Sequence, residues 1–351
     1  MQPITSVYDR ITAVGPGTPA HAIHKRYWQP IGVSAELAPG QTRPVRALGE
    51  DYTLYRGASG QAYLTAARCP HRLTVLHAGW VEGESLRCMY HGWKFDAAGQ
   101  CVEQPAEDAA YAGQVRIPTW PVQEYAGLVY AWLGGGEPPP LPRFAEFDAP
   151  GITPFASIRP PGVWPCNYFQ TLENDLDPVH TTFVHRESEP HWHGVPEVSC
   201  RETDYGMEIT ASRPDYERQT WYHFPNLLHL TVFPIPTQPI HFHMLLYTLP
   251  VDDGHCMFLV SVALPEAFAD KVASGEIVPP GQLPMSAQDI DDLMSGRRRP
   301  HGITEEDYLI MVGQGRNADR GHERLGRSDV AIVMLREIWM RAVDRALREA
   351  S

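Results

Sequence analysis

The chain has 351 residues, of which 43% are hydrophobic and 20% are charged, and its formal net charge is −13 at pH 7. This composition is ordinary for a globular protein, and the length is sufficient for two domains. The negative charge argues against nucleic acid or an anionic membrane as a partner, because both attract basic surfaces.

Targeting and membrane signals are missing from the sequence. Residues 1–6 have neither a basic region nor an apolar stretch typical of a signal peptide. No apolar run approaches the roughly 18 residues that a membrane span requires. The six cysteines are widely scattered, which is typical of reduced thiols rather than of a disulfide framework. We therefore expect a cytoplasmic protein.

The first part of the chain reads as a short helix followed by strands. Residues 19–28 carry a helical pattern, with Ala22, Ile23 and Tyr27 on one side. Short strand-like runs follow at 52–55, 63–66 and 127–132, separated by Gly, Pro and Asp turns. Residues 96–100 resemble a hairpin turn before a strand at 101–102. This pattern predicts a small all-β domain.

Two pairs of metal-binding residues lie within this β-rich region. Cys69 and His71 form the first pair, and Cys88 and His91 form the second after an interval of 16 residues. Two thiolates and two imidazoles suit a [2Fe–2S] cluster in which histidines hold one iron. Zinc is the alternative, although zinc fingers group two cysteines and then two histidines. We expect both pairs on loops at hairpin tips.

A Pro- and Gly-rich stretch at 134–142 marks a domain boundary. Beyond it we expect a helix at 167–174, strands at 240–249 and 257–262, a long loop or flap at 274–300 and a helix at 328–348. The predicted fold class is α+β, with a small all-β domain followed by a larger domain in which helices flank an antiparallel sheet. The predicted parts are an N-terminal segment at 1–28 that packs on the larger domain, and domains at 29–135 and 136–351.

A second candidate metal site follows the boundary. His180 and His185 are five residues apart, so in a straight helix they would diverge by about 140°. They converge only if the helix ends or is distorted between them, and Pro178 supplies a reason for irregularity. Two histidines and a distant carboxylate form the facial triad of non-haem Fe(II) oxygenases. Glu173 and Asn174 are candidate supporting residues.

At this point the chain resembles a known family. The first metal-binding region reads Cys-Pro-His-Arg and then Cys-x-Tyr-His-Gly-Trp-x-Phe-Asp, and the second reads Glu-Asn-x-x-Asp-x-x-His-x4-His. Both are similar to the catalytic α subunit of Rieske non-haem iron ring-hydroxylating oxygenases, in the phthalate-dioxygenase and O-demethylase branch. The resemblance implies a Rieske cluster, a mononuclear Fe²⁺ and mono- or dioxygenase activity, with the four Cys and His residues as cluster ligands.

The third iron ligand must come from later in the chain. The candidates are Glu305, Glu306, Asp307, Asp319 and Asp329. We predict Asp329, because it begins a helix whose apolar side chains share one face and because the resemblance places this ligand at the start of the C-terminal helix. The alternative role for Asp329 is to favour the helix N-terminus, with Ser328 as the N-cap.

Asp177 lies three residues before His180 and could accept its second ring N–H. The resemblance implies that Asp177 also reaches His91 of a neighbouring subunit, so that electrons cross between the subunits of a homotrimer. It further implies a separate NAD(P)H-dependent reductase with flavin and an iron–sulfur cluster. The chain has no Gly-x-Gly-x-x-Gly run after a strand, so we do not expect it to bind nicotinamide itself.

The substrate is less well specified. Asn226, His241 and His243 are candidate pocket residues, and strand alternation puts the two histidines on one face. Core packing is an equally good explanation for them. The resemblance favours a small aromatic acid or ether from aromatic catabolism, with hydroxylation and dealkylation both open. The alternative functions are a Rieske electron-transfer protein without oxygenase activity and a zinc-stabilised scaffold.

Overall fold

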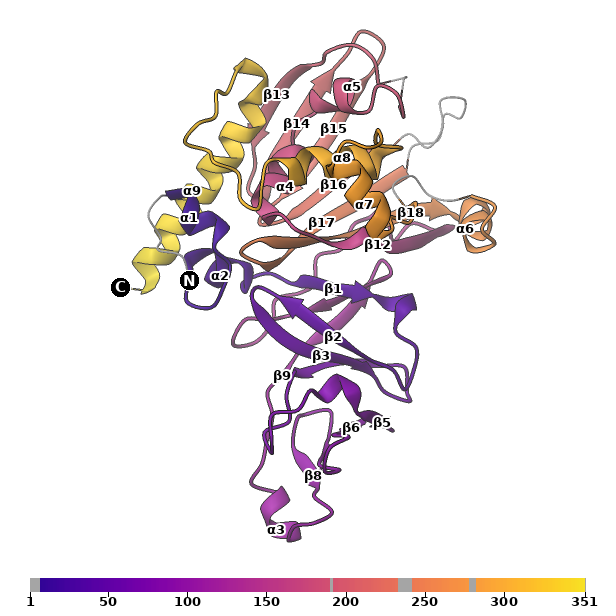
Figure 1. Cartoon of the computed structure of the whole chain (residues 1–351), viewed down its shortest axis with the longest axis vertical. Helices are drawn as coiled ribbons and strands as arrows, with labels where there is room; N and C mark the ends of the chain where they lie inside the picture. The colour runs from indigo at the N-terminus through magenta and orange to yellow at the C-terminus, as the bar shows by residue number, and fades with distance from the viewer. Residues whose placement is uncertain (1–6, 190–191, 233–241, 278–281, 351) are drawn as a thin grey trace. The chain divides into compact units, whose positions relative to one another are not determined.

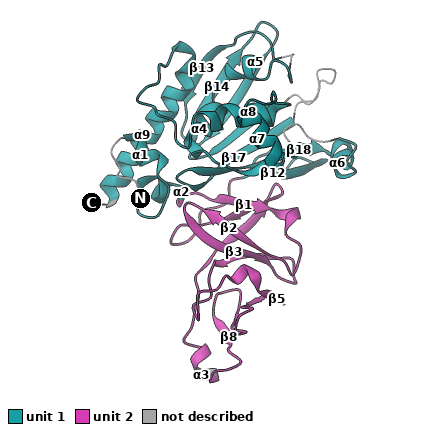
Figure 2. Ribbon diagram, viewed as in Figure 1, with its two compact units in different colours: residues 1–24, 143–351 teal, residues 25–142 magenta. Residues whose placement is uncertain are grey.

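The computed structural model describes residues 7–189, 192–232, 242–277 and 282–350. The chain divides into two compact units (Figure 2). Unit 1 comprises Met1–His24 and Arg143–Ser351, and unit 2 comprises Lys25–Pro142. The boundaries predicted after residues 28 and 135 are near these divisions, and the α+β fold class is confirmed.

Unit 2 consists of three antiparallel sheets. Their strand orders are β1-β11-β10, β2-β3-β4-β9 and β5-β6-β7-β8. The strands are β1 (Gln29–Val33), β2 (Thr42–Ala47), β3 (Glu50–Arg56), β4 (Ala62–Ala66), β5 (Trp80–Glu82), β6 (Ser85–Arg87), β7 (Lys94–Phe95), β8 (Cys101–Glu103), β9 (Thr119–Trp120), β10 (Val122–Tyr125) and β11 (Leu128–Ala131). Short helical turns add η1 (Ser34–Glu36), η2 (Leu76–Ala78) and α3 (Ala109–Ala112).

Unit 1 is built on one seven-stranded antiparallel sheet in the order β12-β18-β17-β16-β15-β14-β13 (Figure 1). The strands are β12 (Ile152–Trp164), β13 (Glu197–Glu202), β14 (Gly206–Ser212), β15 (Glu217–His223), β16 (Leu227–Val232), β17 (Phe242–Asp252) and β18 (His255–Pro265). Consecutive strands from β13 to β18 pair with their neighbours and form a meander. Strand β12 pairs with β18 and forms one edge of the sheet.

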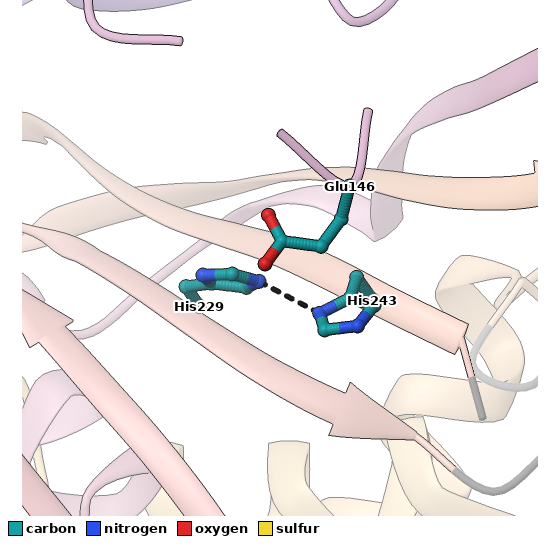
Figure 3. Close-up of side chains that lie close together, drawn as sticks. All are labelled: Glu146, His229 and His243. Atoms are coloured by element: carbon teal, nitrogen blue, oxygen red, sulfur yellow. Dashed lines mark hydrogen bonds between the residues drawn. The ribbon is translucent and has the colours of Figure 1, made fainter. Parts of the chain in front are cut away.

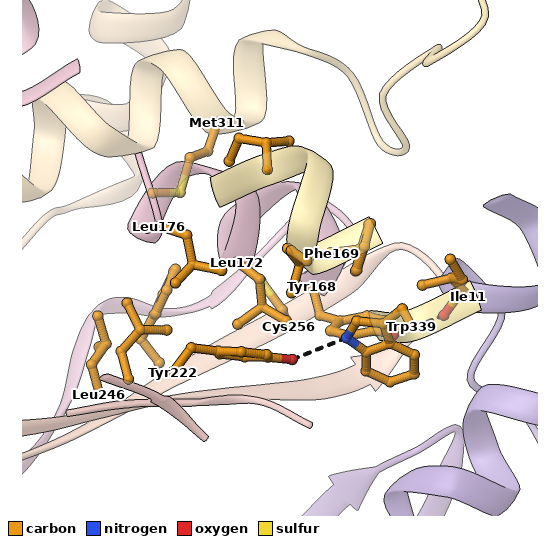
Figure 4. Close-up of a cluster of buried hydrophobic side chains, with 14 of the residues drawn as sticks. Ile11, Tyr168, Phe169, Leu172, Leu176, Tyr222, Leu246, Cys256, Met311 and Trp339 are labelled. Atoms are coloured by element: carbon orange, nitrogen blue, oxygen red, sulfur yellow. Dashed lines mark hydrogen bonds between the residues drawn. The ribbon is translucent and has the colours of Figure 1, made fainter. Parts of the chain in front are cut away.

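Helices cover one face of this sheet. They are α1 (Val7–Thr12), α2 (Pro19–His24), α4 (Tyr168–Asp175), α5 (His180–Val184), α6 (Glu266–Ala273), α7 (Ala287–Met294), α8 (Ile303–Gly313) and α9 (Val330–Ala350), with η3 (Arg327–Asp329) before the last. Their apolar sides and the sheet form one core (Figure 4). Trp339 of α9 is fully buried there and donates its indole N–H to the Tyr222 hydroxyl at 3.0 Å.

The predicted long loop at 274–300 is wrong for its second half, because α7 forms there. Ser286 caps this helix by accepting from the backbone N–H of Asp289, whose side chain in turn accepts from the backbone N–H of Ser286. This reciprocal cap satisfies donors that the first helical turn leaves free. The Pro- and Gly-rich composition of residues 274–300 had predicted a loop in place of this helix. The spacing of Ser286 and Asp289 is nevertheless that of a capping box.

Among the described residues, no helix has the length and apolar character needed to span a membrane. The cytoplasmic location stays a prediction.

Candidate functional site

The two Cys/His loops of unit 2 share one backbone architecture. The N–H of Leu73 donates to the carbonyl of Cys69 at 2.9 Å, and the N–H of Gly92 donates to the carbonyl of Cys88 at 3.0 Å. Leu73 and Gly92 both have positive φ, at 58° and 73°. Each loop thus closes behind its cysteine through a left-handed residue, a conformation that glycine adopts without strain. The same turn therefore presents each Cys/His pair.

The side chains of the four residues separate into a thiol pair and an imidazole pair. Cys69 and Cys88 are each 1% exposed, and burial raises the pKa of the Cys69 thiol to about 12. The rings of His71 and His91 lie 4.4 Å apart between centroids. Their Nδ1 atoms are buried and, within the described part of the chain, have no hydrogen-bond partner. Two sulfurs beside two unpartnered nitrogens fit a cluster with cysteines on one iron and histidines on the other.

In unit 1, the end of a short helix after Val184 lets His180 and His185 come together. Helix α4 ends at Asp175, α5 begins at His180, and His185 follows α5 as its C-cap with φ −96° and ψ 15°. The two rings lie 5.3 Å apart between centroids. Burial lowers the pKa of His180, although Asp307 and Asp177 act in the opposite direction. This favours the neutral imidazole that binds metal.

Asp307 of α8 completes this group. Its Oδ1 lies 3.3 Å from His185 Nε2 and 3.8 Å from His180 Nε2. The other oxygen accepts from Arg159 at 2.6 Å. Burial alone would raise the pKa of Asp307, but Arg159 and the two histidines lower it. The three ligand atoms lie within 4.8 Å of one another, which fits the facial triad of a non-haem iron site.

The outer ring nitrogens of the two histidines have backbone and carboxylate partners. His185 Nδ1 lies 2.8 Å from Glu306 Oε2, which also accepts from Ser188 at 2.6 Å. His180 Nδ1 is hydrogen-bonded to the backbone carbonyl of Asp177. The expected bond to the Asp177 carboxylate is wrong, because that carboxylate accepts the backbone N–H groups of Val179 and His180 instead. Both ring orientations are nevertheless fixed.

The structure corrects the choice of Asp329 as the third ligand. Asp329 lies in η3, where its carboxylate accepts the backbone N–H of Gly326 at 2.6 Å. It therefore stabilises the start of α9, which was the alternative role. Asp307 was only one of several candidates. Its helical spacing could have indicated its burial, because Asp307 lies three or four residues from Thr304, Tyr308 and Met311, which are buried on one side of α8.

Glu173 and Asn174 do not join the metal group. The Glu173 carboxylate is buried and accepts from Arg320 at 2.7 Å and from Arg336 at 2.7 Å. It therefore ties α4 to α9 and to the segment before it. The side-chain amide nitrogen of Asn174 is buried with no hydrogen-bond partner among the described residues.

A cavity of about 210 Å³ adjoins the His180, His185 and Asp307 group, and its wall is mostly apolar. Phe242, Met244 and Leu246 of β17 line it. Because side chains alternate along a strand, His243 faces the other side of the sheet, so its assignment to this pocket is wrong. Asn226 is not in the cavity wall either, since its amide donates to the Thr248 carbonyl at 2.9 Å. The predicted pocket residue His241 lies outside the described residues.

Two ionisable side chains, Arg218 and Asp175, face this cavity. Arg218 Nε is buried and has no hydrogen-bond partner among the described residues, and burial lowers the pKa of Arg218 to about 10. Burial also raises the pKa of Asp175 well above its usual value, which disfavours its charged form. Sequence reasoning missed both residues. The one clue in the sequence was that Arg218 lies in a strand, where alternate side chains face the same side of the sheet.

Comparisons with known proteins agree with these two metal groups. The Rieske [2Fe-2S] domain family matches residues 27–125. The oxygenase subunit of 5,5'-dehydrodivanillate O-demethylase from Sphingobium sp. (strain NBRC 103272 / SYK-6) is 33% identical over 97% of this chain and 80% of that protein. Phenoxybenzoate dioxygenase subunit alpha from Ectopseudomonas oleovorans is 32% identical over 93% of this chain and 82% of its own length.

The chain belongs to the Rieske non-haem iron oxygenases. Solved Rieske oxygenases share its fold. Dicamba monooxygenase superposes with a TM-score of 0.70 at 19% identity, covering 94% of this chain and 100% of that one. The terminal oxygenase of carbazole 1,9a-dioxygenase from Novosphingobium sp. KA1 gives 0.68 at 22% identity, covering 95% and 97%.

Membership confirms the predicted enzyme class and cofactors. The chain is an oxygenase subunit, a Rieske-type mono- or dioxygenase with a [2Fe–2S] cluster and a mononuclear iron. The alternatives of a zinc scaffold and of an electron-transfer protein without oxygenase activity are set aside.

Proposed function

We propose that this Rieske oxygenase subunit hydroxylates or dealkylates a small aromatic acid, at an iron held by His180, His185 and Asp307. The observation that carries the proposal is the position of these three residues in the wall of one apolar cavity. When bound there, Fe²⁺ supplies the redox centre at which O₂ is used. Three protein ligands leave positions open beside the substrate space.

The surrounding residues hold the ligands in the required form. Arg159 binds one oxygen of Asp307 and thereby directs the other toward the histidines. Glu306 lies 2.8 Å from the outer nitrogen of His185, so that Nε2 faces the same point as the Asp307 carboxylate. The apolar wall limits water, which strengthens these contacts.

Arg218 is our candidate for the carboxylate anchor. The Nε atom of Arg218 is buried without a hydrogen-bond partner among the described residues, and the charged form of the nearby Asp175 carboxyl is disfavoured by burial. Such a guanidinium favours an anionic ligand, and its planar donors match a carboxylate. Related proteins are named for phenoxybenzoate, 3-chlorobenzoate and phthalate, which all carry a carboxylate on an aromatic ring. Aromatic side chains such as Phe155 and Trp192 also line the cavity and could pack against the aromatic ring of such a substrate.

Electron delivery in the proposal follows the family resemblance. The subunit would form a homotrimer in which Asp177 connects the iron site to His91 of a neighbouring subunit. The electron donor would be a separate NAD(P)H-dependent flavin and iron–sulfur reductase, directly or through a ferredoxin. Solved complexes of carbazole 1,9a-dioxygenase pair the oxygenase with a ferredoxin, which supports a protein donor of this kind.

An oxygen-uptake screen tests the substrate class. Purified protein with a surrogate reductase is offered aromatic carboxylates, their methyl esters and aromatic methyl ethers, and product mass is read for each active compound. We expect substrate-dependent uptake to be greatest with carboxylates. Equal or faster turnover of the neutral esters would contradict the proposal.

The Arg218→Met variant makes the test specific to the anchor. Loss of a charge-assisted hydrogen bond of about 1.5–3 kcal/mol predicts a KM for the best carboxylate that is about 10–150-fold higher. The KM for its ester should change little. Arg201→Met is the matched control, because Arg201 is an exposed arginine of β13 paired with Glu208.

A further inference from the structure

A second group of metal-binding side chains lies in unit 1, away from the cavity. It consists of Glu146, His229 and His243, and their ligand atoms all lie within 4.8 Å of one another. Figure 3 shows the carboxylate of Glu146 directed at the two imidazoles. His229 Nε2 and His243 Nδ1 lie 3.0 Å apart. The proposed oxygenase function uses none of the three residues.

Strand pairing explains why the two histidines meet. In the register of β16 and β17, His229 lies opposite Leu245 and His243 lies opposite Thr231. The histidines are therefore diagonal neighbours on one face of the sheet. That face is opposite to the one on which Met244 and Leu246 line the cavity. This group is therefore distinct from the His180, His185 and Asp307 site.

A closed turn brings the carboxylate to the histidines. The N–H of Phe147 donates to the carbonyl of Phe144 at 3.0 Å, and Arg143 pairs with Asp148 at 2.6 Å across the same turn. Glu146 sits within this turn and forms no ion pair with an arginine or lysine of the described residues. The Phe144 ring packs edge-on against His229, with 5.3 Å between ring centroids.

These contacts favour a cation between the three side chains. A half-buried carboxylate without a basic partner beside two facing imidazoles gains most from a shared positive ion. Two imidazoles and one carboxylate are a usual donor set for zinc, with a fourth position left for water.

We propose that Glu146, His229 and His243 form a second divalent metal site, which takes Zn²⁺. A bound ion fastens the turn at 143–148, where the chain enters unit 1, to two central strands of the sheet. The proposed site therefore stabilises the packing of this turn on the sheet. It adds a metal to this chain that the Rieske cluster and the mononuclear iron do not account for.

Zinc binding to the holoprotein tests the site. Protein that carries its cluster and its mononuclear iron is dialysed against Zn²⁺, and zinc and iron are measured together. We expect about one zinc per chain with no loss of iron, since the donor set is complete. Glu146→Gln and His243→Gln should each weaken zinc binding by at least about 100-fold, because each removes one of three ligands. X-ray absorption at the zinc edge should show imidazole ligands.

The controls separate this site from others. His193→Gln removes an exposed histidine that pairs only with Asp215, and it should leave zinc binding unchanged. Retention of the mononuclear iron, whose ligands lie in unit 1, confirms that this unit is folded in each variant. The proposal is overturned if the wild type retains no zinc, if zinc enters only as iron leaves, or if folded Glu146→Gln protein binds zinc as the wild type does.

Discussion

Asp307 is the residue on which the geometry of the mononuclear iron site depends. It is 4% exposed, and its two oxygens have different partners, with Arg159 on one side and the two histidines on the other. A buried carboxylate in this position requires positive charge on both sides. Arg159 supplies one, and the metal supplies the other.

Asp329 provides a contrasting prediction. Because the Asp329 carboxylate caps the start of α9, and asparagine keeps the acceptor oxygen but loses the charge, Asp329→Asn should keep the iron and cost about 0.3–1 kcal/mol of unfolding free energy. Urea unfolding and metal analysis measure both quantities. Asp344→Asn, on the exposed side of the same helix, should change stability by less than about 0.5 kcal/mol. Loss of the mononuclear iron from Asp329→Asn would contradict our assignment.

Glu306 gives a second prediction at this scale. It holds the outer nitrogen of His185, so Glu306→Gln should weaken Fe²⁺ affinity by about 10–100-fold while the Rieske cluster stays intact. Iron binding measured by dialysis tests this. Glu305→Gln is the control, because the neighbouring Glu305 pairs with Arg298 instead. Equal iron affinity in both variants would argue against the role of Glu306.

At the scale of elements, local sequence rules predicted much of the architecture. The five-residue spacing of His180 and His185 indicated that the helix ends or is distorted between them, and α5 ends at Val184. The irregularity expected at Pro178 is present as well, but it separates α4 from α5 and lies before both histidines. The C-terminal helix was also predicted closely. The third ligand was not, because which face of α8 meets α5 is decided by tertiary packing and not by local pattern. For the same reason, the sequence could not predict that Arg218 lines the cavity or which face of the sheet His243 occupies.

The buried ion pairs of Glu173 connect α4 with α9. Glu173→Ala would leave Arg320 buried without its carboxylate partner and Arg336 with Glu323 alone, so we expect a loss of about 3–5 kcal/mol in the free energy of unfolding. Urea titration followed by tryptophan fluorescence measures it. Glu202→Ala is the matched control, since its pair with Arg341 of α9 is exposed and should contribute at most about 1 kcal/mol. Similar losses in both variants would refute this account.

At the scale of the whole molecule, the protein combines an electron-relay unit with an oxygen-using unit. Each unit has its own core, and each presents its metal group on short segments fixed by regular structure. The ligand spacing in unit 2 was readable from sequence, because all four residues lie within one short stretch. The iron site in unit 1 draws on segments more than a hundred residues apart, which is why its third ligand was misassigned.

The prediction for the proposed homotrimer concerns the rate of electron transfer from the cluster to the mononuclear iron. If Asp177 connects them across subunits, Asp177→Asn should retain both metals and yet slow oxidation of the reduced cluster in a single turnover by at least about tenfold. Stopped-flow absorbance of the cluster follows this directly. Unchanged rates would remove Asp177 from the electron path. Because its carboxylate also accepts two backbone N–H groups, iron content is measured in the same samples.

The most direct test of the central claim is the iron content of wild-type protein and of Asp307→Asn, measured together with the electron paramagnetic resonance signal of the reduced Rieske cluster. We predict about three irons per chain in the wild type and about two in the variant, with the same cluster signal in both. Two irons per chain in the wild type, or three in Asp307→Asn, would contradict the assignment of His180, His185 and Asp307 as the iron site.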